Sequence, residues 1–380
     1  MKYGILKKCV CGVLTVILVL LALATLFEKW YGSEWALKNI YESWWMVTLW
    51  CILAIASFTY ILHKRLYRQP ATFLLHCAFV VILAGAFVTF LTAGRGYIHL
   101  RQGETLTGYI SDKDATEQAL PFRIKLVLFD IEYHSGTYEP ADYISFLKLD
   151  DRICRVSMNR IQSYHNYRLY QMSYDPDEMG STLGVTHDPW GIGITYAGYM
   201  LLAFSMLWII WIKTGWRGIV CTAIPVAGLW YYISQLNPMT PVLRSPMLAA
   251  HVSVIMISYG LLIFMTITSM IGLCSEKQSK RFYRWNTTLL YPALFLLATG
   301  IFIGAVWANI SWGRYWGWDA KETWALITLL IYAIPFHRAS LPVFRTPKKF
   351  HWFCVAALLT VAMTFFGVTY FLGGMHSYVD

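Results

Sequence analysis

Charged residues are scarce in this sequence, making up 14% of its 380 residues, while hydrophobic residues make up 57%. A disordered chain carries more charge and fewer apolar residues, and an ordinary soluble domain is about one quarter charged. Acidic residues are the scarcer kind, with 21 Asp and Glu against 31 Lys and Arg. The composition therefore excludes both classes and indicates a polytopic membrane protein.

The sequence also lacks a CxxC motif, although it contains eight cysteines. Seven of them lie in or beside apolar runs, and only Cys154 falls in a long polar segment. Without cysteines at this spacing, the sequence predicts neither a zinc site nor a dithiol redox centre, and a disulfide scaffold is not expected. Internal repeats and low-complexity tracts are absent as well.

What the sequence does contain is a series of apolar runs close to the length that crosses a bilayer. They predict nine transmembrane helices, at residues 9–27, 44–62, 71–92, 189–211, 217–235, 251–274, 287–309, 322–336 and 350–372. The first run has no small-residue cleavage site before Glu28, so we expect an anchor and not a cleaved signal.

Lys and Arg predict the orientation of these helices. With the N-terminus inside, the inside loops carry sixteen basic residues and one acid, Glu276. The short outside loops carry only Lys29, Lys38, Arg244, Arg314 and Lys321. The same bias accounts for the formal net charge of +10, so nucleic-acid binding is not needed to explain it and is not expected.

Residues 93–188 form one long segment on the outside. FRIKLVLFDIEY alternates, with Ile124, Leu126 and Leu128 on one face, and YISFLKL and YRLYQMSY alternate as well. Period-two patterns separated by Gly, Pro and Asp clusters predict a small antiparallel β domain. The fold class is therefore a polytopic α-helical membrane protein with one small extracytoplasmic β-rich domain.

Four of the ten histidines form two pairs at matched depths of this topology. His76 and His337 lie toward the inner face, and His251 and His376 lie at the outer face. Ionisable groups in membranes are costly and usually functional, and imidazole is a common axial ligand of haem iron. Spacing alone leaves haem ligation and a structural role as equal alternatives. The other six are interpreted as surface or interfacial residues: His63, His99, His134, His165, His187 and His351.

Residues 311–324, SWGRYWGWDAKETW, concentrate aromatic surface at the predicted outer face. Large flat rings alternate with glycines that let a flat ligand approach the backbone. The residues concerned are Trp312, Gly313, Trp316, Gly317 and Trp318. Asp319 is expected to cap a helix that begins near Ala320. An interfacial aromatic belt is the alternative, but a belt is spread over many helix ends.

This stretch, with the ALITLLIYA that follows it, closely resembles the "WWD" signature of haem-handling proteins. SPMLAAHVSVIMISYG, FHRAS and GGMHSY resemble the three His segments in the CcsA (ResC) half of System II cytochrome c synthases. ESWWMVTLWCILAIASF, FLLHCAFVVILAGAFVT, ISFLKLDD, VSMN and YRLYQMSYD resemble the CcsB (ResB) half. Over nearly its whole length the chain resembles a compact natural fusion of the two halves (CcsBA), with a shorter outer domain and fewer spans than such fusions usually have.

The resemblance implies a domain order and a set of site residues. CcsB-like spans occupy 1–92, the β-rich domain 93–188, a CcsB-like fourth span 189–211, and a CcsA-like haem-handling domain 212–380, with the Trp-rich loop at 310–324. His76 and His337 become ligands of an inner haem b, and His251 and His376 become ligands of an outer haem b. The residues implied to hold the outer haem are Trp312, Gly313, Tyr315, Trp316, Gly317, Trp318, Asp319 and Trp324. Those implied to act in catalysis are His251, His376, Trp316, Trp318 and Asp319.

The implied function is to export haem across the bacterial cytoplasmic membrane and attach it to the CxxCH cysteines of apocytochrome c, as a holocytochrome c synthase of the haem lyase type. Implied partners are the apocytochrome, a thioredoxin-like thiol reductant and membrane lipid. Two alternatives stay open: a haem exporter without attachment activity, and a transmembrane electron carrier with two b-type haems.

Overall fold

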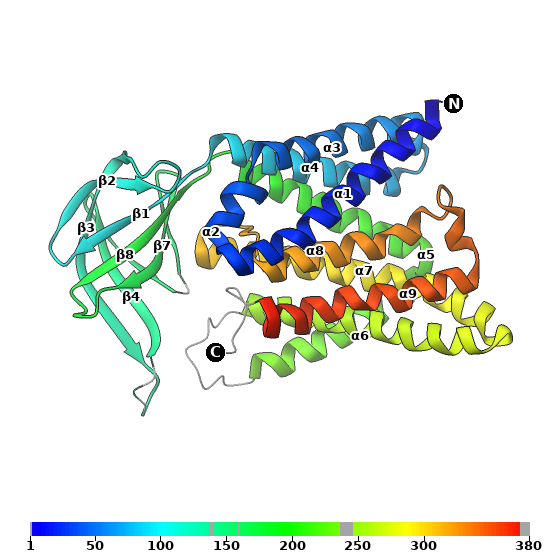
Figure 1. Ribbon diagram of the computed structural model, residues 1–380. Coiled ribbons are helices and arrows are strands. Elements are labelled where there is room, and N and C mark those ends of the chain that lie inside the picture. The colour runs from blue at the N-terminus through cyan, green and yellow to red at the C-terminus, as the bar shows by residue number, and fades with distance from the viewer. Residues whose placement is uncertain (1, 137, 139, 159, 236–245, 373–380) are drawn as a thin grey trace.

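The computed structural model describes residues 2–136, 138, 140–158, 160–235 and 246–372. Apolar helices form a bundle, and a separate antiparallel sheet lies beyond one end of it (Figure 1). Seven helices are long and apolar enough to cross a membrane in this part of the chain. They are α1 (Lys2–Tyr31), α3 (Trp44–His63), α4 (Pro70–Thr92), the first part of α5 (Gly191–Gln235), α6 (Pro246–Cys274), α7 (Glu276–Trp312), and α9 (Pro347–Ala362) with its continuation η5 (Met363–Leu372).

Two of the nine predicted spans coincide with shorter helices. α5 bends at Gly215, where φ is 65°, and its second part is the apolar helix Gly218–Ile233. α8 (Ala320–Ala333) has 14 residues and passes into the 3-10 turn η3 (Ile334–His337). A helix of that length is about 21 Å long, less than the roughly 30 Å thickness of the hydrocarbon layer. The number of membrane crossings and their orientation therefore stay predictions.

The sheet has eight antiparallel strands in the order β5-β4-β3-β2-β1-β8-β7-β6. They are β1 (Gly94–Arg101), β2 (Thr105–Ser111), β3 (Glu117–Tyr133), β4 (Pro140–Leu149), β5 (Arg152–Ser157), β6 (Gln162–Tyr164), β7 (Tyr167–Tyr174) and β8 (Gly180–His187). Leu147 on β4 and Leu169 on β7 belong to one buried apolar cluster, although five places in the strand order separate β4 from β7. Ser145 on β4 also donates a hydrogen bond to Gln171 on β7, with the oxygens 2.7 Å apart. The sheet therefore curls around a single core.

The alternation predicted for β3 holds only for part of the strand. Ile124 and Leu126 are fully buried, but Leu128 is 43% exposed and Phe129 takes the buried position instead. The register against β4 shifts between Leu126 and Leu128, which marks a β-bulge. One extra residue in a strand reverses the faces of those beyond it. The prediction that Leu128 shares the buried face was therefore wrong.

His351 also differs from its interpretation as a surface or interfacial residue, because it is fully buried. Its Nε2 donates to the backbone oxygen of Ser279 over 3.0 Å, and its Nδ1 lies 3.1 Å from the hydroxyl of Ser269. One imidazole therefore joins α6, α7 and α9, and the prediction for His351 was wrong.

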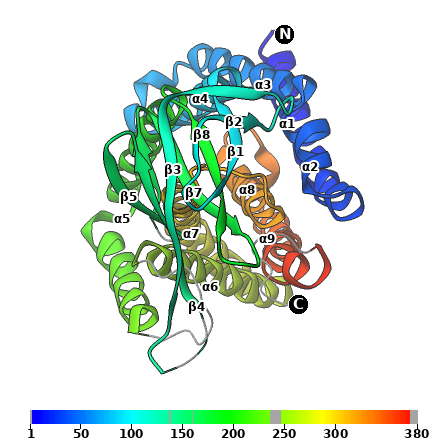
Figure 2. The ribbon, with the colours of Figure 1, turned by 90° about the vertical axis from the view of Figure 1, so that its left-hand side faces the viewer.

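The sheet rests on the end of the bundle where α7 stops and α8 begins (Figure 2). Arg95 on β1 pairs with Glu42 over 2.9 Å, and Arg168 on β7 donates a hydrogen bond to Asn309 on α7. Gly313 lies so close to β7 that a Cβ there would be 2.8 Å from the ring of Tyr170. The β domain therefore packs directly on the loop that joins α7 to α8.

Candidate functional site

The structure brings together two of the histidines singled out from the sequence. His76 lies on α4 and His337 on η3, and their ring centres are 6.0 Å apart with perpendicular planes (89°). The Nδ1 of His76 is 2.8 Å from the backbone oxygen of Thr72, and that of His337 is 3.2 Å from the backbone oxygen of Ala333. A carbonyl oxygen only accepts hydrogen bonds, so each Nδ1 carries the proton and each Nε2 keeps its lone pair.

This is the state in which an imidazole binds a metal through Nε2. The N–H of a ligating histidine is usually held by a carboxylate or a carbonyl, which fixes its tautomer and orientation. Two imidazoles on opposite sides of one metal, each nitrogen about 2 Å from it, have ring centres roughly 6 Å apart. The spacing of His76 and His337 therefore fits two axial ligands of one haem iron.

The turn that follows η3 is held by helices from the other end of the chain. Lys7 on α1 donates to the backbone oxygen of Ser340. The hydroxyl groups of Tyr60 on α3 and Ser340 lie 3.0 Å apart. These contacts fix His337, three residues earlier, relative to the helices beside His76.

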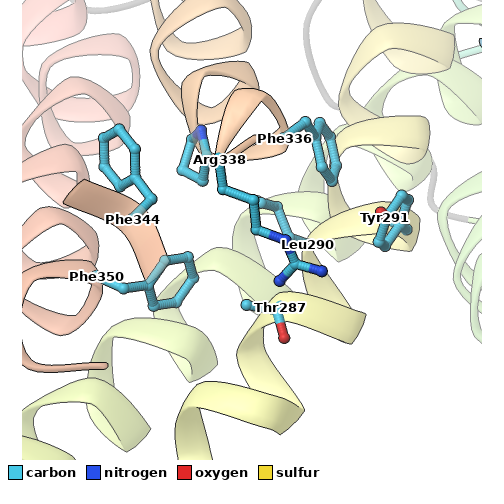
Figure 3. A pocket seen from close by; sticks show the side chains of 8 residues that line it. Thr287, Leu290, Tyr291, Phe336, Arg338, Phe344 and Phe350 are labelled. Atoms are coloured by element: carbon cyan, nitrogen blue, oxygen red, sulfur yellow. The ribbon is translucent and has the colours of Figure 1, made fainter. Parts of the chain in front are cut away.

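A pocket opens beside the same turn (Figure 3). Its lining is mainly aromatic and apolar, and the side chain of Arg338 reaches into it between Leu290 and Thr287. The remaining lining residues are Tyr291, Pro335, Phe336, Phe344 and Phe350. The residue directly after His337 thus places a guanidinium group over an apolar surface.

His251 is fixed between two helices near the other end of the bundle. It lies on α6, and its Nδ1 is 2.7 Å from the backbone oxygen of Gly300 on α7. A Cβ at Gly304, one turn further along α7, would lie 2.6 Å from the ring. Gly304 therefore lets α7 approach the imidazole closely, and Gly300 does the same for Ile255 on α6. His376 lies outside the described residues, so the predicted pair of His251 and His376 stays a prediction.

The Trp-rich loop has defined ends. α7 ends at Trp312, and Gly313 follows with φ 68°, the left-handed conformation that commonly terminates helices. α8 begins at Ala320, and the Asp319 side chain caps it by accepting the backbone N–H of Lys321 over 2.8 Å, as the sequence predicted. Glu322 reaches back to accept the N–H of Gly317 over 2.9 Å.

The tryptophan rings of this loop pack against one another and against the N-terminal part of the chain. Trp318 stacks on Tyr41, with ring centres 5.0 Å apart and planes within 8°. Trp316 meets Trp318 edge to face at 5.7 Å. Trp312 packs at 4.9 Å on Trp307, and the indole N–H of Trp324 donates to Thr25 on α1 over 3.2 Å. Rings from the loop therefore link the two ends of the chain.

Tyr315 ties the loop to the base of the β domain. Its hydroxyl donates to Thr89 on α4 over 3.0 Å, and Thr89 donates to Asp188 over 2.7 Å. The other oxygen of Asp188 accepts the N–H of Gly191 at the start of α5 over 2.8 Å. Burial raises the pKa of the Tyr315 phenol, so it remains a donor at neutral pH.

Two features of the loop are not explained by its protein neighbours. The Nε1 of Trp316 is buried and has no hydrogen-bond partner among the described residues. The atoms nearest to a Cβ at Gly317 would belong to the side chain of Arg314, at an ordinary contact distance of 3.4 Å, so close packing does not require glycine there. An unmatched donor beside a position without a side chain suits a flat ligand that carries acceptor groups, as haem does.

Several partners of the site carried no signal in the sequence. They are Thr25, Tyr41, Thr89, Asp188 and Ser340. Thr25, Tyr41, Thr89 and Asp188 lie at least 99 residues from the residues they contact, and Ser340, which follows His337 by three residues, is held by Lys7 and Tyr60 from the other end of the chain. Only the tertiary fold brings such residues to the site.

Two family models match this chain. Residues 63–193 match the ResB-like family, and residues 191–376 match the Cytochrome C assembly protein family. The matches meet at the start of α5, so the assignment of 189–211 to the CcsB-like half stays a prediction. His76 falls in the first match, whereas His251, His337 and the Trp-rich loop fall in the second.

The relatives agree with these matches. The chain is 31% identical over 245 residues to a cytochrome c biogenesis protein CcsA from Pyropia yezoensis, covering 76% of that protein and 48% of this chain. It is 36% identical over 157 residues to CcsA from Chlamydomonas reinhardtii, covering 44% of that protein and 38% of this chain. With the protein NrfI from Wolinella succinogenes it shares 35% identity over 183 residues, 20% of that protein and 42% of this chain.

The fold is thus that of a multi-pass membrane protein with an appended β domain. The chain belongs to the Cytochrome C assembly protein family and joins to it a ResB-like region, as in a fused CcsB–CcsA protein of System II. It spans only about a fifth of NrfI and less than half of the Chlamydomonas reinhardtii relative.

Proposed function

We propose that this protein acts in cytochrome c maturation by carrying haem b outward through the bacterial cytoplasmic membrane and attaching it to apocytochrome c. The names of its relatives support a role in cytochrome c biogenesis. The N-terminus would lie inside and the C-terminus outside, with the β domain on the outer side, as the distribution of Lys and Arg indicates.

One observation carries the proposal: a histidine of the ResB-like region and a histidine of the cytochrome c assembly region meet at 6.0 Å. His76 and His337 would ligate haem from opposite sides at the inner end. Neither region could offer both ligands, so haem at this site would require the fusion or a complex of the two parts. This requirement supports the proposal that the ResB-like region and the cytochrome c assembly region function together as one haem-binding unit.

At the outer end, His251 and His376 would ligate haem, with the Trp-rich loop against its edge. Trp316 offers a buried N–H without a partner among the described residues, and Gly317 beside it has no side chain that would stand between the backbone and a flat ligand. With its Nδ1 held by the backbone oxygen of Gly300, His251 would ligate through Nε2. Asp319 would act by fixing the start of α8, and so the loop.

Attachment needs positioning more than it needs a nucleophile from this chain. Each cysteine S–H of CxxCH adds across one haem vinyl group, so a C–S and a C–H bond form and no group leaves. The protein would hold the porphyrin edge toward the cysteines, exclude the wrong orientation and keep both axial positions of the iron occupied. The histidine of CxxCH would then replace one axial ligand and release the product. A thioredoxin-like reductant would keep the cysteines as thiols.

Purified full-length protein, apocytochrome c and reduced haem test the proposal. We expect low-spin absorption bands typical of two histidine ligands, and haem that stays on the cytochrome after extraction with acidified acetone. Haem that is bound but fully extractable from the cytochrome would indicate an exporter or an electron carrier. A protein that stays without low-spin bands after loading with haem would contradict the ligand assignment.

A further inference from the structure

The first turns of α7 carry a concentration of positive charge. Lys277, Lys280, Arg281 and Arg284 lie within eight residues, and the acid nearby is Glu276. Among the residues that the structure describes, none of these four basic side chains belongs to an ion pair. These turns lie at the end of the bundle away from the β domain (Figure 1).

Two of these cations line a surface pocket on α7. Its lining consists of Arg281, Arg284, Trp285, Thr288 and Leu289. The guanidinium carbon of Arg281 lies 4.5 Å from the centre of the Trp285 ring, within the range of a cation–π contact. The Trp285 side chain is 44% exposed, so the indole holds the guanidinium in place without covering it.

The pocket changes from charged to apolar along the helix axis. From Arg281 to Leu289 α7 rises about 12 Å, at about 1.5 Å per residue. α7 has 37 residues and is therefore about 55 Å long, well beyond the roughly 30 Å hydrocarbon thickness. Its first turns thus extend past the apolar stretch that begins near Thr287. Trp285 lies at that boundary, where tryptophan is enriched in membrane proteins.

We propose that this pocket binds the headgroup of an anionic glycerophospholipid. Arg281 and Arg284 both line the pocket, and a guanidinium group binds phosphate with paired N–H donors. The hydroxyl of Thr288 lies at the level of the glycerol, and Leu289 contacts the beginning of an acyl chain. A free phosphate ion would leave the apolar side chains of Trp285 and Leu289 uncovered, which favours the lipid. The site is independent of haem chemistry.

The test compares lipid retention by the full-length protein in native mass spectrometry. Detergent-purified protein is titrated with phosphatidylglycerol or phosphatidylcholine of the same acyl composition. The double variant Arg281→Gln/Arg284→Gln is compared with Lys348→Gln/Lys349→Gln, which removes two exposed charges from the first turn of α9 and leaves the pocket intact. Melting curves of both variants check that they remain folded.

We expect wild-type protein to retain phosphatidylglycerol in preference to phosphatidylcholine, and the Arg variant to lose about fivefold in affinity per guanidinium removed. The Lys variant should bind as the wild type does. Equal retention of the two lipids, or equal losses in both variants, would overturn the site. Displacement of the lipid by millimolar inorganic phosphate would identify a phosphate ion site and overturn the lipid assignment.

Discussion

Trp318 lies face to face with Tyr41, with ring centres 5.0 Å apart and planes within 8°. Tyr41 belongs to a short π-helical segment before α3, near one end of the chain, and Trp318 to the Trp-rich loop. Trp318 also has φ 56°, an uncommon conformation for a residue with a side chain. The stack therefore holds the loop in a conformation that its local sequence does not favour.

Replacing Tyr41 should loosen this part of the loop. Tyr41 is 3% exposed, so Tyr41→Ala should lower the free energy of unfolding by about 3 kcal/mol, from lost burial and lost stacking. Tyr41→Phe keeps the ring and should retain most of that stability. Thermal unfolding and the spectrum of bound haem measure the two effects. A Tyr41→Ala protein with wild-type haem binding would show that the stack does not position the loop.

The inner histidines provide a second prediction. His76→Gly removes one of two imidazoles that meet across the two family regions, so the low-spin spectrum of inner haem should be lost. Added imidazole should partly restore it by occupying the vacant axial position. If inner haem supplies the outer site, the outer haem should fall as well. The matched control is His99→Gly, which removes a histidine from β1. Normal loading of outer haem without His76 would separate the two sites.

Gly304 gives a way to disturb His251 without changing it. In Gly304→Ala the new Cβ would lie 2.6 Å from the imidazole, so the ring must move away from its carbonyl partner on Gly300. Alanine also favours helix by up to about 1 kcal/mol, so a weakened α7 would not explain a loss of outer haem. We expect outer haem and attachment activity to fall, as they should in His251→Gly.

Gly260→Ala is the control for that experiment. Gly260 lies on α6, the helix of His251, and a Cβ there has no atom within 4 Å among the described residues. It should bind haem as the wild type does. If Gly304→Ala and His251→Gly both keep full attachment activity, His251 is a structural hydrogen-bonding residue and not a ligand.

The sequence predicted those features that depend on local pattern. Apolar runs marked the long helices, and Asp319 followed by Ala320 marked the start of α8 because an N-cap acts within one turn. The prediction that His76 and His337 lie toward the same face agrees with the 6.0 Å between their ring centres, whereas their depth in a membrane stays a prediction. The family of the chain followed from the resemblance of the Trp-rich segment and the three His segments to cytochrome c synthases, and the family matches confirm it.

Features that depend on long-range contacts could not be predicted from the sequence. The bulge that exposes Leu128 arises from the pairing of β3 with β4, so its position could not be predicted from the residues of β3 alone. His351 is buried because Ser269 and Ser279, from two other helices, satisfy both ring nitrogens. The stack of Tyr41 on Trp318 joins residues that only the tertiary fold brings together.

The last prediction concerns the Trp-rich loop as a surface for haem. The atoms nearest to a Cβ at Gly317 belong to the flexible side chain of Arg314, at 3.4 Å, so we expect Gly317→Val to fold, and its melting curve checks this. If haem lies against this backbone, the valine should exclude it.

Trp316→Ala should also weaken haem binding, because it removes a ring that could stack on the porphyrin. Base–aromatic stacking suggests a scale of about 1–3 kcal/mol per ring, or roughly a ten- to hundredfold loss of haem affinity. The control is Trp50→Phe on α3, which keeps an aromatic ring at a tryptophan outside the loop. Haem titration and the yield of covalently bound cytochrome separate the outcomes. Loss of outer haem in Gly317→Val, with normal melting and an unaffected control, would identify the loop as the surface that holds haem. Unchanged haem content and attachment in both Gly317→Val and Trp316→Ala would reduce the loop to an interfacial aromatic belt.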